Sequence, residues 1–133
     1  MKFSRKTDYG IILMKGLEHT YAQGNFMPTS AIAEKYKISS AFLEKLADIL
    51  RKGGYLEAKR GFKGGYRLIK NPKKITIEEL INVFEEPPMM RCLYSNHPEK
   101  HCPLVKTCPA RKAWIGINEQ VNNIFRKTTL AKI

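Results

Sequence analysis

An apolar stripe that starts just after residue 39 constrains the fold more than any other feature of the chain. The apolar side chains recur at positions i, i+1, i+4, i+7 and i+8, which is the spacing of one buried helical face. They are Phe42, Leu43, Leu46, Ile49 and Leu50. Ser39 or Ser40 can cap the start of this helix, and Gly53-Gly54 stops it.

Two further helices are predicted before this stripe. The first can be capped by Ser4 or Thr7 and ends near residues 23–25; it carries Ile11, Leu13, Met14, Leu17 and Tyr21. The second helix begins at Pro28-Thr29-Ser30, and its side chains Ile32, Ala33 and Tyr36 are expected to face the core. Only Lys37 and Ile38 link it to the third helix. Two helices joined by so short a turn are typical of a helix-turn-helix.

The residues after the third helix predict a small β-hairpin. Residues 55–59 and 66–69 have the composition of short strands, and between them lies a glycine-rich turn crowded with cations, Arg60-Gly61-Phe62-Lys63-Gly64-Gly65. Thr76 then caps a helix whose apolar side is formed by Ile77, Leu80, Ile81 and Phe84. The predicted fold class is mainly α with a small β-wing, that is, a winged helix-turn-helix.

The charge of the chain favours an anionic partner. Its 24 Lys and Arg against 12 Asp and Glu give a net charge of +12, a balance that attracts nucleic acid or anionic lipid. Residues 51–74 carry a single acid, Glu57. Their nine basic residues are Arg51, Lys52, Lys59, Arg60, Lys63, Arg67, Lys70, Lys73 and Lys74. The alternative, an ordinary solvated face, fits less well beside a helix-turn-helix.

Double-stranded DNA is therefore the predicted partner. The third helix would enter the major groove by its N-terminal end, with Ser39 and Ser40 on phosphate and Glu44 on cytosine N4. Lys45 and Arg51 would hold phosphates. The wing would supply Lys59, Arg60 and Lys63, of which the last two can reach the adjacent minor groove.

The C-terminal part of the sequence predicts a second apolar helix. Pro87-Pro88 breaks the helical pattern, and a helix starting near Pro109 repeats apolar residues four and three apart at Ala110, Trp114, Ile117, Val121 and Ile124. We expect this seam to pack against a second copy in a homodimer, the alternative being the chain's own core. The predicted parts are a DNA-binding domain over 1–86, a cysteine-containing loop over 87–108 and a dimerisation helix with its tail over 109–133.

Several motifs together resemble a known family. They are Tyr9, Ile38-Ser39, the segment Phe42-Leu43-Glu44-Lys45-Leu46, the wing from Arg60 to Leu68, and cysteines before a C-terminal helix. With them the chain resembles, over essentially its whole length, the bacterial winged-helix iron-sulfur regulators of the IscR, NsrR and CymR type. This resemblance implies a dimer that binds a palindromic promoter site, and in many members a cluster held by three cysteines and a fourth, variable ligand.

All three cysteines lie in one segment, as Cys92, Cys102 and Cys108. An odd number of cysteines cannot all pair in disulfides, but three close together are a plausible ligand set. Two of the cysteines precede a proline, as in loops that bind iron-sulfur clusters. A Cys3His zinc site using His97 or His101 and free, redox-active thiols remain alternatives. The first gap of nine residues departs from the family's spacing of about five, which the second gap keeps.

The resemblance also bears on the fourth ligand. Asp8 stands where the nitric-oxide-sensing branch supplies a carboxylate ligand, which slightly favours a [4Fe-4S] over a [2Fe-2S] cluster. An acid that merely stabilises a helix N-terminus is the alternative role of Asp8.

The protein is predicted to be a transcription regulator, and a repressor rather than an activator. Its promoter binding is expected to change with the state of an iron-sulfur cluster that senses redox, nitric oxide or iron-sulfur status. The alternatives are a cofactor-free regulator of cysteine or sulfur metabolism acting with a protein partner, and a basic, zinc-stabilised nucleic-acid-binding protein. No catalytic motif is present, so neither an enzyme nor a small-molecule substrate is expected. Neither a membrane span nor a signal peptide is apparent, which predicts a cytoplasmic protein.

Overall fold

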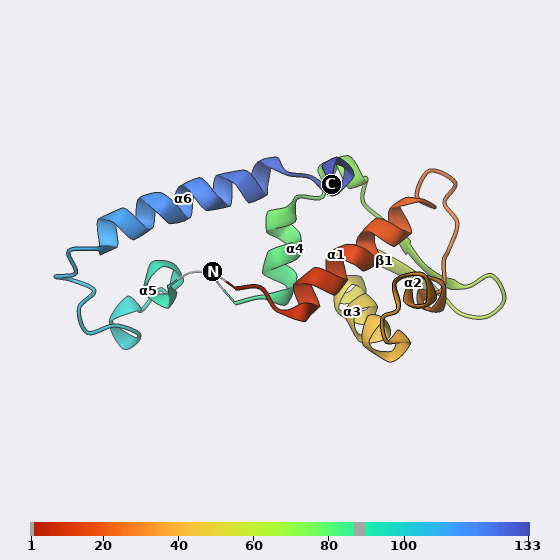
Figure 1. Ribbon diagram of the computed structural model, residues 1–133, viewed down its shortest axis with the longest axis horizontal. Coiled ribbons are helices and arrows are strands. Elements are labelled where there is room, and N and C mark those ends of the chain that lie inside the picture. The colour runs from red at the N-terminus through yellow and green to blue at the C-terminus, as the bar shows by residue number, and fades with distance from the viewer. Residues whose placement is uncertain (1, 87–89) are drawn as a thin grey trace.

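The computed structural model describes residues 2–86 and 90–133 and is built mainly of helices (Figure 1). The Pro87-Pro88 break lies outside the described residues. In chain order the elements are α1 (Arg5–Glu18), α2 (Thr29–Tyr36), α3 (Ser40–Lys52), β1 (Leu56–Lys59), β2 (Gly65–Leu68), η1 (Pro72–Lys74), α4 (Ile77–Phe84), α5 (Arg91–Tyr94), η2 (Pro98–Lys100), α6 (Arg111–Lys127) and η3 (Leu130–Lys132). None of the helices in the described ranges is long and apolar enough to cross a membrane.

The core lies among the first four helices and the wing, which together form what we call the winged-helix unit (residues 4–85). Leu13, Met14 and Leu17 of α1 are fully buried there with Leu43 and Leu50 of α3. At Gly10 an added Cβ would lie 2.3 Å from the Phe84 ring. The glycine therefore lets α1 approach α4 closely.

The predicted helix-turn-helix is confirmed at α2 and α3. Lys37 ends α2 in the left-handed conformation with φ of 57°, and the Ser39 hydroxyl caps α3 by accepting a hydrogen bond from the Phe42 backbone N–H at 3.3 Å. Two predicted core positions are wrong, since Tyr36 is 41% and Ile49 36% exposed. Tyr36 is the last residue of α2, just before the left-handed Lys37. Ile49 lies at the edge of the buried stripe of α3.

The predicted wing is also confirmed. Strands β1 and β2 are antiparallel and pair Leu56 with Leu68 and Lys59 with Gly65. Thr76 caps α4 as the sequence predicts, and the structure adds a reciprocal contact in which the Glu79 carboxylate accepts from the Thr76 backbone N–H.

The two ends of the winged-helix unit meet at Glu85. One oxygen of its carboxylate accepts hydrogen bonds from the Ser4 backbone N–H, at 2.6 Å, and from the hydroxyls of Ser4 and Thr7. Desolvation tends to raise the pKa of Glu85, but these hydrogen bonds outweigh it and hold the pKa below its usual value. The charge is favourably placed because the first turn of a helix has unsatisfied backbone N–H groups.

Residues 90–127 form a C-terminal arm that leads away from the unit and back (Figure 1). Neither α5 nor α6 contains a buried residue. The chain then returns to the unit: the Ile77 N–H donates to the Thr128 carbonyl and the Leu130 N–H to the Ile75 carbonyl, both at 2.8 Å. Leu130 is fully buried. The tail, which the sequence assigned to the dimerisation part, thus completes the core of the unit.

Candidate nucleic-acid interface

The N-terminal end of α3 is exposed. Ser39 serves as its cap, Ser40 is its first residue, and Lys45 follows one turn later, and all three are exposed. Backbone N–H groups at such a helix start attract phosphate, because they are unsatisfied and carry the positive end of the helix dipole. The geometry therefore leaves these three predicted contacts available.

Glu44, in contrast, is already engaged within the chain. Its carboxylate accepts hydrogen bonds from the Thr29 hydroxyl of α2 and, at 3.0 Å, from the Tyr66 hydroxyl of β2. Burial of the phenol raises the pKa of Tyr66, and the hydrogen bond to the Glu44 carboxylate raises it further, so the phenol stays protonated and remains a donor. Glu44 therefore fastens α3 to both the preceding helix and the wing. The roles of Thr29 and Tyr66 were missed from the sequence, which contains no local signal for contacts so far apart.

Arg51 also has a partner in its own helix. Asp48 accepts from Arg51 at 2.7 Å and pairs with Lys52 at 2.8 Å. Hydrogen bonds from Lys52 and Arg51 lower the pKa of Asp48, so it is ionised at neutral pH. Any phosphate contact of Arg51 has to compete with this pair. Asp48, Arg51 and Glu44 line one side of an open groove of about 960 Å³ whose other side is the wing.

The wing cations divide into two groups. Arg67 is structural, because it pairs with Glu57 at 2.9 Å, donates to the Gly24 carbonyl at 2.9 Å and lies over the Phe26 ring at 4.5 Å. Lys59, Arg60 and Lys63 are exposed, and within the part of the chain that the structure describes none has a carboxylate within 4.0 Å. These three residues, here called the wing cations, carry the uncompensated charge of the wing.

The cysteines occupy three different places in the arm. Cys92 lies in α5, Cys102 follows η2 and Cys108 precedes α6, and all are half-buried free thiols. Asp8 is exposed in the first turn of α1, 3.6 Å from Arg5. Residues 2–86 and 90–133 contain no group of three or more His, Cys, Asp or Glu side chains that could hold a metal ion. As placed in one chain, these donors do not fit a cluster.

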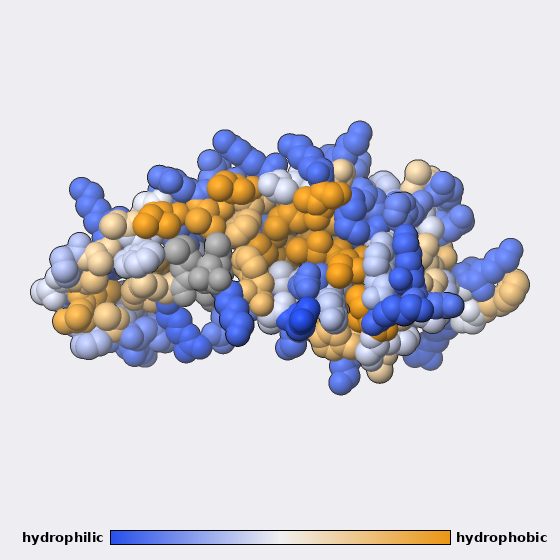
Figure 2. Space-filling model, viewed as in Figure 1, coloured by the Kyte–Doolittle hydropathy of each residue, from blue (hydrophilic) through white to orange (hydrophobic). Residues whose placement is uncertain are grey.

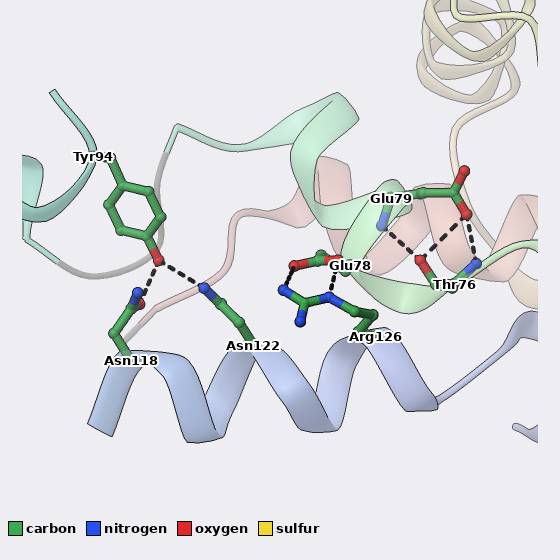
Figure 3. A network of polar contacts seen from close by, with 7 residues as sticks. All are labelled: Thr76, Glu78, Glu79, Tyr94, Asn118, Asn122 and Arg126. Atoms are coloured by element: carbon green, nitrogen blue, oxygen red, sulfur yellow. Dashed lines mark hydrogen bonds and ion pairs between the residues drawn. The ribbon is translucent and has the colours of Figure 1, made fainter. Parts of the chain in front are cut away.

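Polar side chains join α5 to α6 within the arm, and the arm to α4 (Figure 3). The Tyr94 hydroxyl of α5 donates to Asn118 and accepts from Asn122 at 3.2 Å. One turn further along α6, Arg126 forms a bidentate contact with Glu78 of α4 at 3.1 and 3.2 Å. This polar row on α6 therefore faces the chain itself.

The apolar residues of α6 are largely exposed. Ile117 is 45% and Ile124 64% exposed, while Trp114 and Val121 are half-buried. Figure 2 shows apolar side chains gathered along α6 and continuing onto the middle of the molecule. Exposed apolar residues gathered on one side of a helix are typical of surfaces that contact another protein.

These features define a class of protein. A winged helix-turn-helix with an exposed recognition-helix start and uncompensated cations on its wing is the architecture of a DNA-binding protein. Residues 3–133 match the family model of Rrf2, which is described as an iron-dependent transcriptional regulator. The chain belongs to the Rrf2 family of DNA-binding transcriptional regulators. It is therefore not an enzyme, as its sequence predicts.

Individual relatives match almost all of the chain. This chain is 34% identical over 133 residues to the HTH-type transcriptional regulator CymR of Bacillus subtilis, and the match covers 98% of this chain and 87% of that protein. It is 27% identical to IscR of Yersinia pseudotuberculosis, covering 100% of this chain and 79% of the relative. The solved structure of CymR, described as the global cysteine regulator of Bacillus subtilis, superimposes with a TM-score of 0.78 at 29% identity, covering 99% and 95% of the two chains. The resemblance to the IscR and CymR type of regulator is thus confirmed.

Proposed function

We propose that this regulator represses transcription by binding a palindromic promoter site as a homodimer. In each half-site the N-terminal end of α3 enters the major groove, with Ser39, Ser40 and Lys45 on phosphates. Arg51 contributes when it leaves Asp48, and Glu44 accepts from a cytosine with its free lone pairs. The wing cations Lys59, Arg60 and Lys63 bind the phosphates and minor groove alongside. The observation that carries the proposal is the absence of any carboxylate beside these cations in the described residues.

The second copy would pack on α6. The exposed residues Ile117 and Ile124 lie seven positions apart, which places them on one side of the helix. Burying this side against an identical helix removes apolar surface from water, and a two-fold axis between two such helices gives the symmetry of a palindromic site.

The test of DNA binding is a matched pair of charge reversals. One variant changes Lys59, Arg60 and Lys63 to Glu, and its control changes Lys100, Lys106 and Lys112, which are exposed in the arm. Each variant lowers the net charge by six. We expect the wing variant to lose binding to the protein's own promoter, and the control to keep a steep salt dependence of about 0.9 in the log-log slope per phosphate contact. Fluorescence anisotropy measures both. Equal loss in the two variants would refute the assignment of the wing.

The signal that controls binding has two candidates. The first is an iron-sulfur cluster, with [4Fe-4S] favoured, whose ligands would be Cys92, Cys102, Cys108 and Asp8; the family description as iron-dependent supports it, and soft thiolates suit iron. The second is a cofactor-free regulator of sulfur metabolism acting with a protein partner. The 34% identity to CymR supports it.

Metal analysis separates these candidates. After anaerobic purification we would measure iron, sulfide and zinc together with the absorption near ~400 nm that iron-thiolate centres show. A cluster requires that Cys92→Ala, Cys102→Ala and Cys108→Ala each remove the iron, and that Asp8→Ala only hasten its loss. His97→Ala and His101→Ala are the controls. Wild-type protein without iron would favour the cofactor-free regulator, whereas stoichiometric zinc would favour a zinc-stabilised nucleic-acid-binding protein.

A further inference from the structure

The tip of the wing presents an aromatic ring to solvent. Phe62 is 88% exposed, more than any other large apolar residue in the described ranges, the next being Ile124 at 64%. Its neighbours fix the turn: Gly61 has φ of 90°, and the Gly64 N–H donates to the Gly61 carbonyl at 3.0 Å. Phe62 therefore contributes nothing to the core and projects from an ordered turn.

The surroundings of the ring are cationic. Arg60 and Lys63 flank Phe62 in sequence, and the Lys63 Nζ lies 5.6 Å from the centroid of its ring. Since the wing cations have no carboxylate beside them in residues 2–86 and 90–133, the tip as a whole is positively charged. An apolar ring between free cations is complementary to a surface where anionic phosphates flank stacked, apolar bases. A groove of double-stranded DNA is such a surface.

We propose that Phe62 is a wedge that enters the minor groove beside each half-site and partly unstacks one base step. This inference rests on the proposed binding of promoter DNA. Apolar side chains act in this way in minor-groove proteins, where the inserted residue kinks the duplex. Arg60 and Lys63 hold the flanking phosphates while the ring makes contact. Pyrimidine-purine steps unstack most easily, so the wedge confers a preference for TA or CA/TG at a position that makes no hydrogen bond to the protein.

The test uses the whole protein and its own promoter duplex, with 2-aminopurine placed at successive positions outward from each half-site. The fluorescence of this base rises when it unstacks. We expect wild-type binding to raise it at one flanking step on each side, and Phe62→Ala to abolish the rise and weaken binding roughly tenfold, the range of base stacking on an aromatic ring. The variant should keep the wild-type salt slope, because phenylalanine neutralises no phosphate.

Arg60→Ala is the matched control. It should lower the salt slope by about 0.9, the value for one phosphate contact, and keep the fluorescence rise. Because Phe62 is so exposed, its replacement should leave the circular dichroism spectrum and the sedimentation coefficient unchanged.

The outcomes are distinguishable. Wild-type binding without any fluorescence rise overturns the wedge, as does a Phe62→Ala variant with unchanged affinity and profile. A change in oligomeric state on replacing Phe62 would assign the ring to a contact between protein chains and also overturn it. A wild-type protein that does not bind its promoter overturns the proposed function itself.

Discussion

The winged-helix unit and the C-terminal arm are stabilised in opposite ways. In the unit, α1 and α3 each bury at least three apolar side chains in a common core, to which α4 adds Leu80. In the arm, neither α5 nor α6 buries any residue; polar contacts join Tyr94 of α5 to α6, and Arg126 of α6 to Glu78 of α4. The apolar side of α6 stays open.

The difference shows which region has a hydrophobic core of its own chain. Apolar burial is the dominant favourable contribution to folding, and the unit has it. Exposed hydrogen bonds and ion pairs contribute little, typically under about 1 kcal/mol each. The proposed homodimer would supply the arm with the apolar burial that it lacks, and the two regions should respond differently to substitution.

The largest expected effect is on the open side of α6. Ile117→Glu would place a charge in the proposed seam, where a desolvated, unpaired carboxylate costs several kcal/mol, so the dimer should weaken by at least about 100-fold. Trp114→Glu should act likewise, and promoter affinity should fall with dimerisation. Analytical ultracentrifugation measures the change, and Gln120→Glu, an exposed position on the same helix, is the control. A variant that remains dimeric would place the second copy elsewhere.

Leu130 tests whether the tail belongs to the unit. Leu130→Ala removes a fully buried side chain and should lower the free energy of unfolding by about 2 to 5 kcal/mol. Ile133→Ala, at a residue that is 50% exposed, should change it by less than about 0.5 kcal/mol. Urea denaturation compares the two. Similar midpoints for both variants would mean that the tail is not part of the cooperative core.

Tyr94→Phe should act on the arm alone. The change deletes the hydroxyl that joins α5 to Asn118 and Asn122, a loss of about 1 kcal/mol or less at an exposed site. Amide hydrogen exchange should quicken in residues 91–94 and stay unchanged in α1 and α3. Tyr36→Phe, whose hydroxyl lies on the exposed end of α2, serves as the control. Faster exchange throughout the molecule would mean that the two regions are coupled more tightly than their contacts indicate.

The smallest expected effect is a pH dependence within the unit. The pKa of Glu85 is lowered in the folded state, so its contribution is present above the usual glutamate pKa and is lost as the pH falls through the lowered value. Glu85→Gln should therefore lower the melting temperature slightly at pH 7 and remove part of the decline in acid. Glu34→Gln, at an exposed position, should leave both unchanged. A Glu85→Gln variant whose melting temperature declined in acid as steeply as that of the wild type would contradict this role.

The sequence predicts the local parts of the molecule well and its distant contacts poorly. The caps at Ser39 and Thr76 and the stripe of α3 follow from spacing alone, because they involve neighbours in the chain. The Glu44 contacts with Thr29 and Tyr66 and the burial of Leu130 join residues far apart in sequence, for which periodicity carries no signal. The ligand roles of the cysteines and of Asp8, and the individual DNA contacts, stay predictions.

The pairing of Thr76 with Thr129 sets an order of events during synthesis. The two positions are 53 apart in the chain, so at about 5 to 20 residues per second the second follows the first by roughly 3 to 11 s. For most of that interval α1 to α4 are already made, but the site that Leu130 fills is empty and the arm up to α6 is still being synthesised. If two copies pair through α6 as proposed, neighbouring nascent chains on a polysome meet through this helix before either core is closed, so that assembly and folding are concurrent rather than successive.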